Sequence, residues 1–126
     1  MKKIAMGLVA SLLVLAGVSL AAPRARTFHG QIFDSQCAMA GSHAMMVKKF
    51  MGPNMDANDP KTRAMCTKKC VSMGGKYVLY NLKTKTIYQL DDQTKPEQFA
   101  GQDVTVKGTY DKATKTIHVE SIEAAS

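Results

Sequence analysis

The sequence predicts a mainly β domain of five strands, with a helical insertion between the first strand and the second. Residues 76–123 alternate apolar and polar side chains and are rich in β-branched and aromatic residues, a pattern typical of strands. Residues 27–75 differ in composition, because they hold all three cysteines and all seven methionines that follow residue 21. The predicted order is strand, helical insertion, two strands, short helix, two strands. This order matches a five-stranded barrel of the OB type, whose sheet closes on itself.

The strands are predicted at residues 27–34, 76–81, 86–90 and 104–110, with a fifth from residue 117 onward. Pro96 at a first-turn position and Gly101 as a stop predict the short helix. Ile122 falls out of phase in the last strand, which indicates a bulge near Ser121. Gly30 and Gly108 are expected where strongly bent strands turn. Seven alternating residues are expected in the core: Val78, Tyr80, Ile87, Val104, Val106, Ile117 and Val119.

The first residues have the features of a signal peptide. Lys2 and Lys3 precede an apolar run from Ile4 to Leu20, and small residues lead to a cleavage site after Ala21. An uncleaved membrane anchor is the alternative, but it needs a longer apolar stretch. We therefore expect signal peptide 1–21, a periplasmic or secreted product, and no stable membrane span after cleavage.

Residues 22–126 are expected to form a single domain. Removal of residues 1–21 leaves 105 residues and lowers the net charge from +7 to +5, because Lys2 and Lys3 are lost. A domain of this size has a modest core and often needs a metal or a disulfide to stabilise it. The lysines are scattered rather than gathered in a basic stripe with interleaved aromatics, so no nucleic acid partner is predicted.

The insertion, about residues 37–75, is expected to contain two helices. Asp59 as N-cap and Pro60 as first helical residue begin one, which Gly74 and Gly75 end. The other runs from His43 to Met51. Residues 38–42 are predicted to be a flexible turn, which leaves Cys37 on a short loop.

Three cysteines and one histidine in the insertion suggest a metal site. An odd cysteine count leaves one thiol unpaired in any set of internal disulfides, whereas three thiolates and an imidazole complete a tetrahedral Zn²⁺ site. Cys66 and Cys70 are four apart, so both lie on one helix face, and Cys37 and His43 can close over them. The alternative is one disulfide from Cys37 to Cys66 or Cys70, which an oxidising compartment favours.

Methionine makes copper the alternative metal. Thioethers and thiolates select monovalent copper, and Met39, Met45 and Met65 are candidate auxiliary ligands. The C-x3-C helix with a distant histidine also resembles the copper site of cytochrome oxidase assembly chaperones, although the strand pattern does not fit their thioredoxin-like fold. Met46 is instead expected to fill gaps in the core, with Phe50 and Val71.

The segments DSQCAMAGSH, CTKKCVSMGGKYVLYN and YQLDDQTKPEQFAGQDVTVKGTYD resemble a family of small exported bacterial proteins of uncharacterised function with an OB-like barrel. The resemblance covers roughly residues 28–123 and implies the fold, export and a metal-like constellation, but no established activity. Its pattern, D-S-x-C, a histidine and C-x3-C, is matched by Asp34, Ser35, Cys37, His43, Cys66 and Cys70.

No pattern in the sequence indicates an enzyme: Ser-His-Asp, a glycine-rich phosphate loop and a haem attachment site are all missing. Three kinds of function remain. The first is an exported module with a structural zinc ion at Cys37, His43, Cys66 and Cys70. The second is a copper-handling or thiol-redox envelope protein that uses Cys66 and Cys70. The third is a disulfide-stabilised barrel that binds another envelope protein or an oligosaccharide.

Overall fold

The computed structural model describes Gly17 and residues 23–126, so the predicted signal peptide lies almost wholly outside the described residues. Within the described residues, no helix has both the length and the apolar character that a membrane crossing requires. The elements are β1 (Arg26–Asp34), α1 (Ser35–Ala40), α2 (Ala44–Phe50), α3 (Pro60–Ser72), β2 (Tyr77–Asn81), β3 (Thr86–Leu90), the 3-10 helix η1 (Lys95–Phe99), β4 (Asp103–Asp111) and β5 (Thr116–Ala124).

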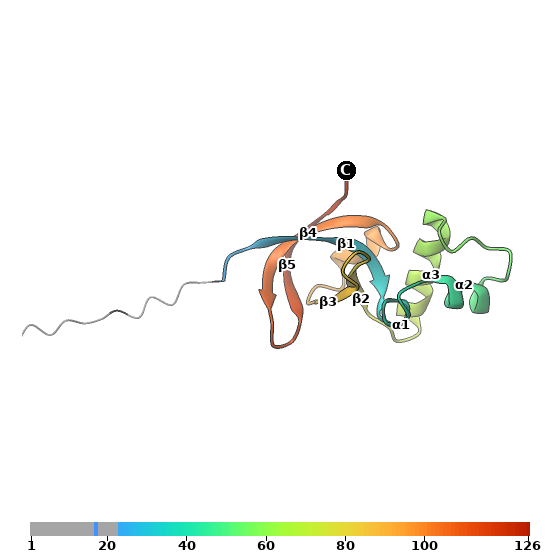
Figure 1. The fold of residues 1–126 in the computed structure, drawn as a ribbon, viewed down its shortest axis with the longest axis horizontal. Coiled ribbons are helices and arrows are strands. Elements are labelled where there is room, and N and C mark those ends of the chain that lie inside the picture. The colour runs from blue at the N-terminus through green and yellow to red at the C-terminus, as the bar shows by residue number, and fades with distance from the viewer. Residues whose placement is uncertain (1–16, 18–22) are drawn as a thin grey trace, which may run out of the picture.

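The five strands form a ring-like sheet. They pair in the closed order β1-β2-β3-β5-β4, and β4 pairs with β1 to complete the ring. Every pairing is antiparallel except the short parallel contact of β3 with β5. The insertion between β1 and β2 contributes three helices that gather at one end of the ring (Figure 1). The fold is thus mixed α/β, which is broader than the mainly β class predicted.

The bulge predicted near Ser121 is confirmed. Lys107 pairs with Ser121 and Gly108 pairs with Val119, so Glu120 is an extra residue on β5. Gly108 lies at this irregularity, where a side-chain Cβ would stand 2.2 Å from the His118 carbonyl oxygen. Gly30 on β1 is equally close to its neighbour, because a Cβ there would lie 2.6 Å from the carbonyl oxygen of Tyr80. Both glycines therefore permit close approach of adjacent backbones.

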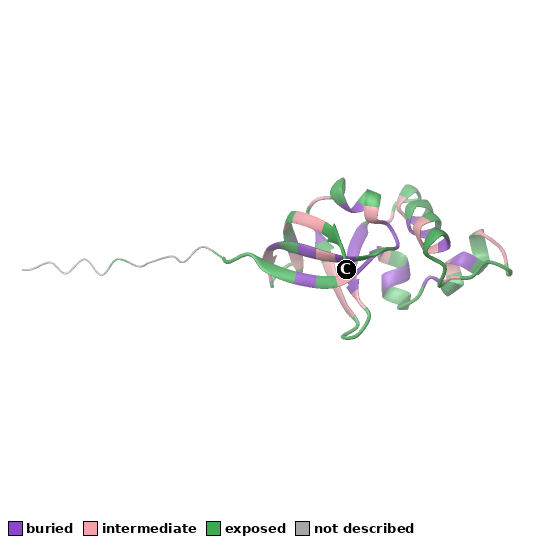
Figure 2. Cartoon of the chain, turned by 90° about the horizontal axis from the view of Figure 1, so that it is seen from above, coloured by how far each residue is buried: buried purple, intermediate pink, exposed green. Residues whose placement is uncertain are grey.

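Two hydrophobic clusters share the strands. One fills the ring and includes Phe28, Ile32, Leu79, Val106 and Ile117. The other lies between the ring and the helices, and Figure 2 shows the buried stretches on both the strands and the inner helix faces.

Strand β2 separates the two clusters and has four consecutive buried residues. Leu79 points into the ring, whereas Val78 and Tyr80 face the helices. The predicted core residues Val78 and Tyr80 are therefore buried, but in the second cluster rather than inside the ring.

The remaining core predictions vary in outcome. Val104, Val106 and Ile117 are buried inside the ring, while Val119 and Ile87 are only half-buried. Within the insertion, Val71 and Met46 are half-buried, and the prediction that Phe50 lies in the core is wrong because this residue is 36% exposed. The position that packs inward from α2 is Val47 instead.

Candidate metal centre

Cys37 lies on a helix rather than on the predicted loop. Asp34 ends β1 and caps α1, since its Oδ2 accepts a hydrogen bond of 2.9 Å from the Cys37 backbone nitrogen. Gly41, with φ of +75°, ends the helix in the left-handed conformation. An N-cap aspartate followed by a terminating glycine was visible in the sequence. Because the helix is only six residues long, its sequence pattern resembles that of a turn.

The long helix of the insertion follows the prediction closely. Asp59 caps α3 by accepting from the backbone nitrogens of Lys61 and Thr62, and Pro60 is the first helical residue. On this helix Cys66 and Cys70 are buried along one face. Arg63 attaches α3 to the ring, because its Nε donates a 2.9 Å hydrogen bond to the Gly101 carbonyl oxygen.

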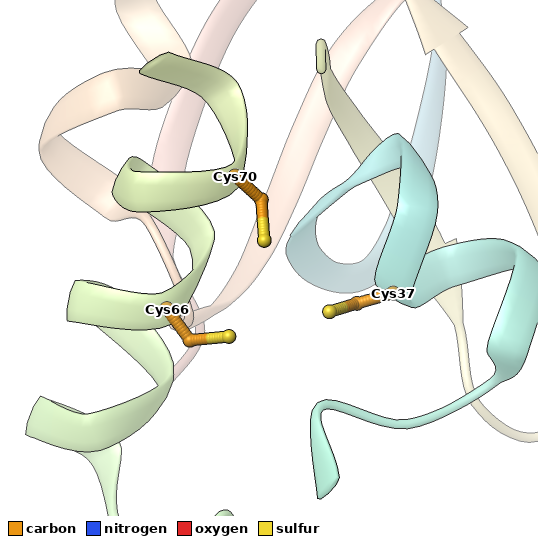
Figure 3. A group of neighbouring side chains, drawn as sticks. All are labelled: Cys37, Cys66 and Cys70. Carbon is orange, nitrogen blue, oxygen red and sulfur yellow. The ribbon is translucent and has the colours of Figure 1, made fainter. Parts of the chain in front are cut away.

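The three cysteines converge in the space between α1 and α3. Figure 3 shows Cys66 and Cys70 extending from α3 toward Cys37, which extends from α1 in the opposite direction. The three sulfur atoms all lie within 4.8 Å of one another, and each residue is at most 2% exposed. All three are free thiols. Three buried, converging thiols can hold a thiophilic metal ion.

His43 borders this cluster and precedes α2. Its ring nitrogen, the Cys37 sulfur and an Asp34 carboxylate oxygen form a second group within 4.8 Å of one another. His43 is 3% exposed, and its ring stacks on Phe33 with a centroid separation of 4.0 Å. The four predicted ligands thus lie in one buried region, although His43 belongs to the group with Asp34 and Cys37 rather than to the three-cysteine group.

A chain of hydrogen bonds sets the tautomer of His43. Gln31 Nε2 donates to Asp103 Oδ1 at 3.2 Å, and Gln31 Oε1 lies 3.3 Å from His43 Nε2. A carboxylate only accepts, so the Gln31 amide must direct its NH₂ to Asp103 and its oxygen to His43. The His43 Nε2 therefore carries the proton, and Nδ1 carries the free lone pair. Ligating histidines are held in this way by a partner on the other ring nitrogen.

Three buried polar atoms have no hydrogen-bond partner among the described residues: Asp34 Oδ1, His43 Nδ1 and Thr67 Oγ1. An unpartnered buried polar atom costs about 1–3 kcal/mol, so such atoms are rare in stable proteins. Asp34 and His43 belong to the second ligand group, and Thr67 follows Cys66 directly on α3. A cation bound among the sulfurs would provide a partner for the His43 lone pair and a counter-charge for Asp34.

Without a cation, the three cysteines differ in pKa. A hydrogen bond with Cys66, reinforced by burial, raises the pKa of Cys37 far above its usual range. The same hydrogen bond with Cys37 lowers the pKa of Cys66 to about 5, although burial opposes it. Burial, together with the charge of Asp34, raises the pKa of Cys70 to about 12. A cation bound at these sulfurs would release the protons that the cysteines carry.

The candidate copper ligands lie elsewhere. Met39, Met45 and Met65 are 78%, 69% and 52% exposed, so the structure places all three on the surface. No sequence pattern indicates a role for Gln31, Asp103 or Thr67. Gln31 and Asp103 are 72 residues apart and meet only because β1 pairs with β4, so no local pattern marks them.

Residues 72–125 are similar to a family described as "Protein of unknown function (DUF5818)". The matched segment begins at the last residue of α3 and ends just after β5, so it covers β2 to β5 and none of the cysteines. Searches found no matching curated protein and no matching solved structure. The predicted resemblance to uncharacterised proteins is thus confirmed over the strand-rich half, while for the cysteine-bearing half it stays a prediction.

Proposed function

We propose that this chain is an exported metal-binding module in which Cys37, Cys66, Cys70 and His43 hold one structural zinc ion between the helical insertion and an OB-like barrel. The observation that carries the proposal is the convergence of three buried sulfur atoms within 4.8 Å of one another, beside an unpartnered imidazole nitrogen. Three thiolates and one imidazole are a donor set that suits tetrahedral Zn²⁺.

The barrel assignment is supported by the order of the strands. The closed order β1-β2-β3-β5-β4, with β3 and β5 parallel, is that of a five-stranded Greek-key barrel. The insertion occupies the connection between its first two strands. A metal ion at the cluster would link α1, which continues directly from β1, to α3, which leads into β2.

We propose a structural rather than a catalytic role for the ion. Four protein ligands leave no open coordination position for water or substrate, and the cysteines are inaccessible to solvent. Asp34 would stay outside the first coordination shell, where its Oδ2 caps α1 and its negative charge favours a cation over protons at the sulfurs. Residues 1–21 would direct the chain out of the cytoplasm before the metal is bound.

The decisive experiment is metal stoichiometry on the mature protein, combined with thiol titration. We expect one zinc ion per chain, and three titratable thiols after denaturation in the presence of a chelator without reductant. Chelation should also lower the melting temperature, because binding and folding are coupled at such sites. His43→Ala should weaken zinc binding, while the matched variant His29→Ala, at an exposed histidine, should leave binding unchanged.

Two results would contradict the proposal. A single titratable thiol, no stoichiometric metal and destabilisation by reductant would show a disulfide instead. Stoichiometric copper, with zinc unable to replace it, would favour the copper-handling or thiol-redox function that the lowered pKa of Cys66 also permits.

A further inference from the structure

A groove on the far side of β3 from β2 is separate from the metal centre. It has a volume of about 590 Å³ and lies where the β4–β5 hairpin diverges from β3. The start of α1 forms one end, and the side chain of Tyr110 forms part of its wall. The other residues that carry the argument are Met39, Lys85, Ile87 and Lys115.

The groove exposes a free strand edge. β3 pairs with β5 only at Gln89 and Leu90, where the Gln89 backbone nitrogen donates to the Lys115 carbonyl oxygen at 2.8 Å. Backbone groups two residues apart in a strand point to the same side. The N–H and C=O of Ile87 therefore point toward the groove as those of Gln89 do, but in the part of the chain that the structure describes no strand pairs with them.

The groove is positively charged at both sides. Lys85 and Lys115 are exposed. Each lies at the tight turn that precedes a strand, where its backbone has a positive φ, 56° for Lys85 and 53° for Lys115. Among the residues that the structure describes, no acidic side chain lines the groove. The nearby Asp111 carboxylate already accepts a hydrogen bond from the Ala113 backbone nitrogen. Between the lysines the surface is partly apolar, with Met39 78% exposed and both Ile87 and Tyr110 half-buried.

We propose that this groove binds an extended acidic peptide segment of a partner protein. The segment would add a strand to the free edge of β3, through hydrogen bonds to the N–H and C=O of Ile87. Its carboxylates would pair with Lys85 and Lys115, and its apolar side chains on the helix-facing side would pack over Ile87. A second copy of this chain fits poorly, because two-fold pairing of β3 edges would bring the lysines of both copies together.

The test uses a labelled hexapeptide of alternating glutamate and valine, with a lysine–valine hexapeptide as the charge control. We expect the acidic peptide to bind, to lose affinity as salt is added, and to shift the amide resonances of Ile87 and Lys115. The double variant Lys85→Glu/Lys115→Glu should weaken binding about tenfold, which corresponds to two modest surface ion pairs. The matched double variant Lys61→Glu/Lys107→Glu, at exposed lysines that do not line the groove, should bind as the parent does.

A second peptide separates strand addition from simple charge attraction. N-methylation of alternate backbone amides removes the donors that an added strand needs, so the methylated acidic peptide should bind weakly although its charge is unchanged. Equal binding of both peptides, amide shifts elsewhere on the ring, or no binding of the acidic peptide would overturn the proposal. So would a neutral oligosaccharide that shifts these amides where the peptide does not. These readouts concern Ile87, Lys85 and Lys115, so a negative peptide result leaves the metal stoichiometry of the cysteines unaffected.

Discussion

The ring and the helical insertion are stabilised by different means. The ring encloses an apolar cluster whose members, such as Ile32, Leu79 and Val106, are completely buried, and each contributes about 1.5–3 kcal/mol through burial. The insertion encloses three thiols and an imidazole beside a carboxylate. Besides the cysteines, the main apolar residues packed there are Phe33, Val47, Val78 and Tyr80.

This difference shows which part of the molecule needs a ligand. The ring closes on itself through strand pairing and hydrophobic burial. All three buried polar atoms that lack a partner among the described residues lie in the insertion or at its entry. We therefore expect the ring to remain folded when the cluster loses its ion, and the insertion to loosen. The predictions that follow test this division, from the largest expected effect to the smallest.

The largest effect is expected from a charge inside the ring. Val106 is completely buried among apolar side chains, so Val106→Asp would place an unpaired carboxylate there. We expect a loss on the order of 4 kcal/mol in the free energy of unfolding, measured by urea denaturation. Lys107→Asp, at the exposed neighbouring residue, should change this free energy little. If both variants melt like the parent, the ring is not the stable unit of the fold.

Loss of one sulfur should affect the insertion alone. Cys70→Ser replaces a thiolate with a poor zinc ligand, so we expect the variant to lose stoichiometric metal. In hydrogen exchange, amides of α1 and α3 should lose protection while those of β4 and β5 keep theirs. Ser72→Ala, an exposed change on the same helix, should retain the metal and the protection. Simultaneous loss of protection in ring and insertion would show that the two regions unfold as one unit.

A smaller effect is expected where the ring supports the site. Gln31 lies on β1 and holds the proton of His43 on Nε2, so Gln31→Leu should leave the fold intact but release the imidazole from its tautomer. Removal of such a supporting hydrogen bond typically lowers metal affinity 10–100-fold. Competition with a chromophoric chelator measures the change, and the exposed Gln102→Ala is the matched control. An unchanged affinity would mean that His43 does not ligate the ion.

Much of the ring was predictable, because the sequence patterns that indicate its strands are local. Alternation located β4 and β5, and the phase of Ile122 located the bulge. Val78 and Tyr80 are core residues as predicted, but the sequence does not show which of the two clusters they join, because β2 is buried on both faces. The pairing of β2 with β1 and β3 decides which face of β2 meets the helices, and no local sequence pattern indicates that pairing.

The approach of the three cysteines to one another was also predictable, from residue type and helical spacing. Their supporting residues were not. Gln31 and Asp103 are ordinary polar strand residues until β1 pairs with β4 and places their side chains in contact. The sequence likewise does not show that these methionines are exposed, because a methionine on a short helix has the same sequence pattern whether it packs inward or faces solvent.

The smallest expected effect concerns those methionines and separates zinc from copper. Met39, Met45 and Met65 are each more than half exposed, while the three cysteines of the cluster are buried. The triple variant Met39→Leu/Met45→Leu/Met65→Leu conserves apolar volume and removes every candidate thioether ligand. We expect metal stoichiometry, zinc affinity and monovalent copper affinity all to match the parent. A selective fall in copper affinity would mean that the insertion rearranges to bring surface thioethers to the cysteines. That result would make the insertion a copper-binding unit rather than a zinc-stabilised one.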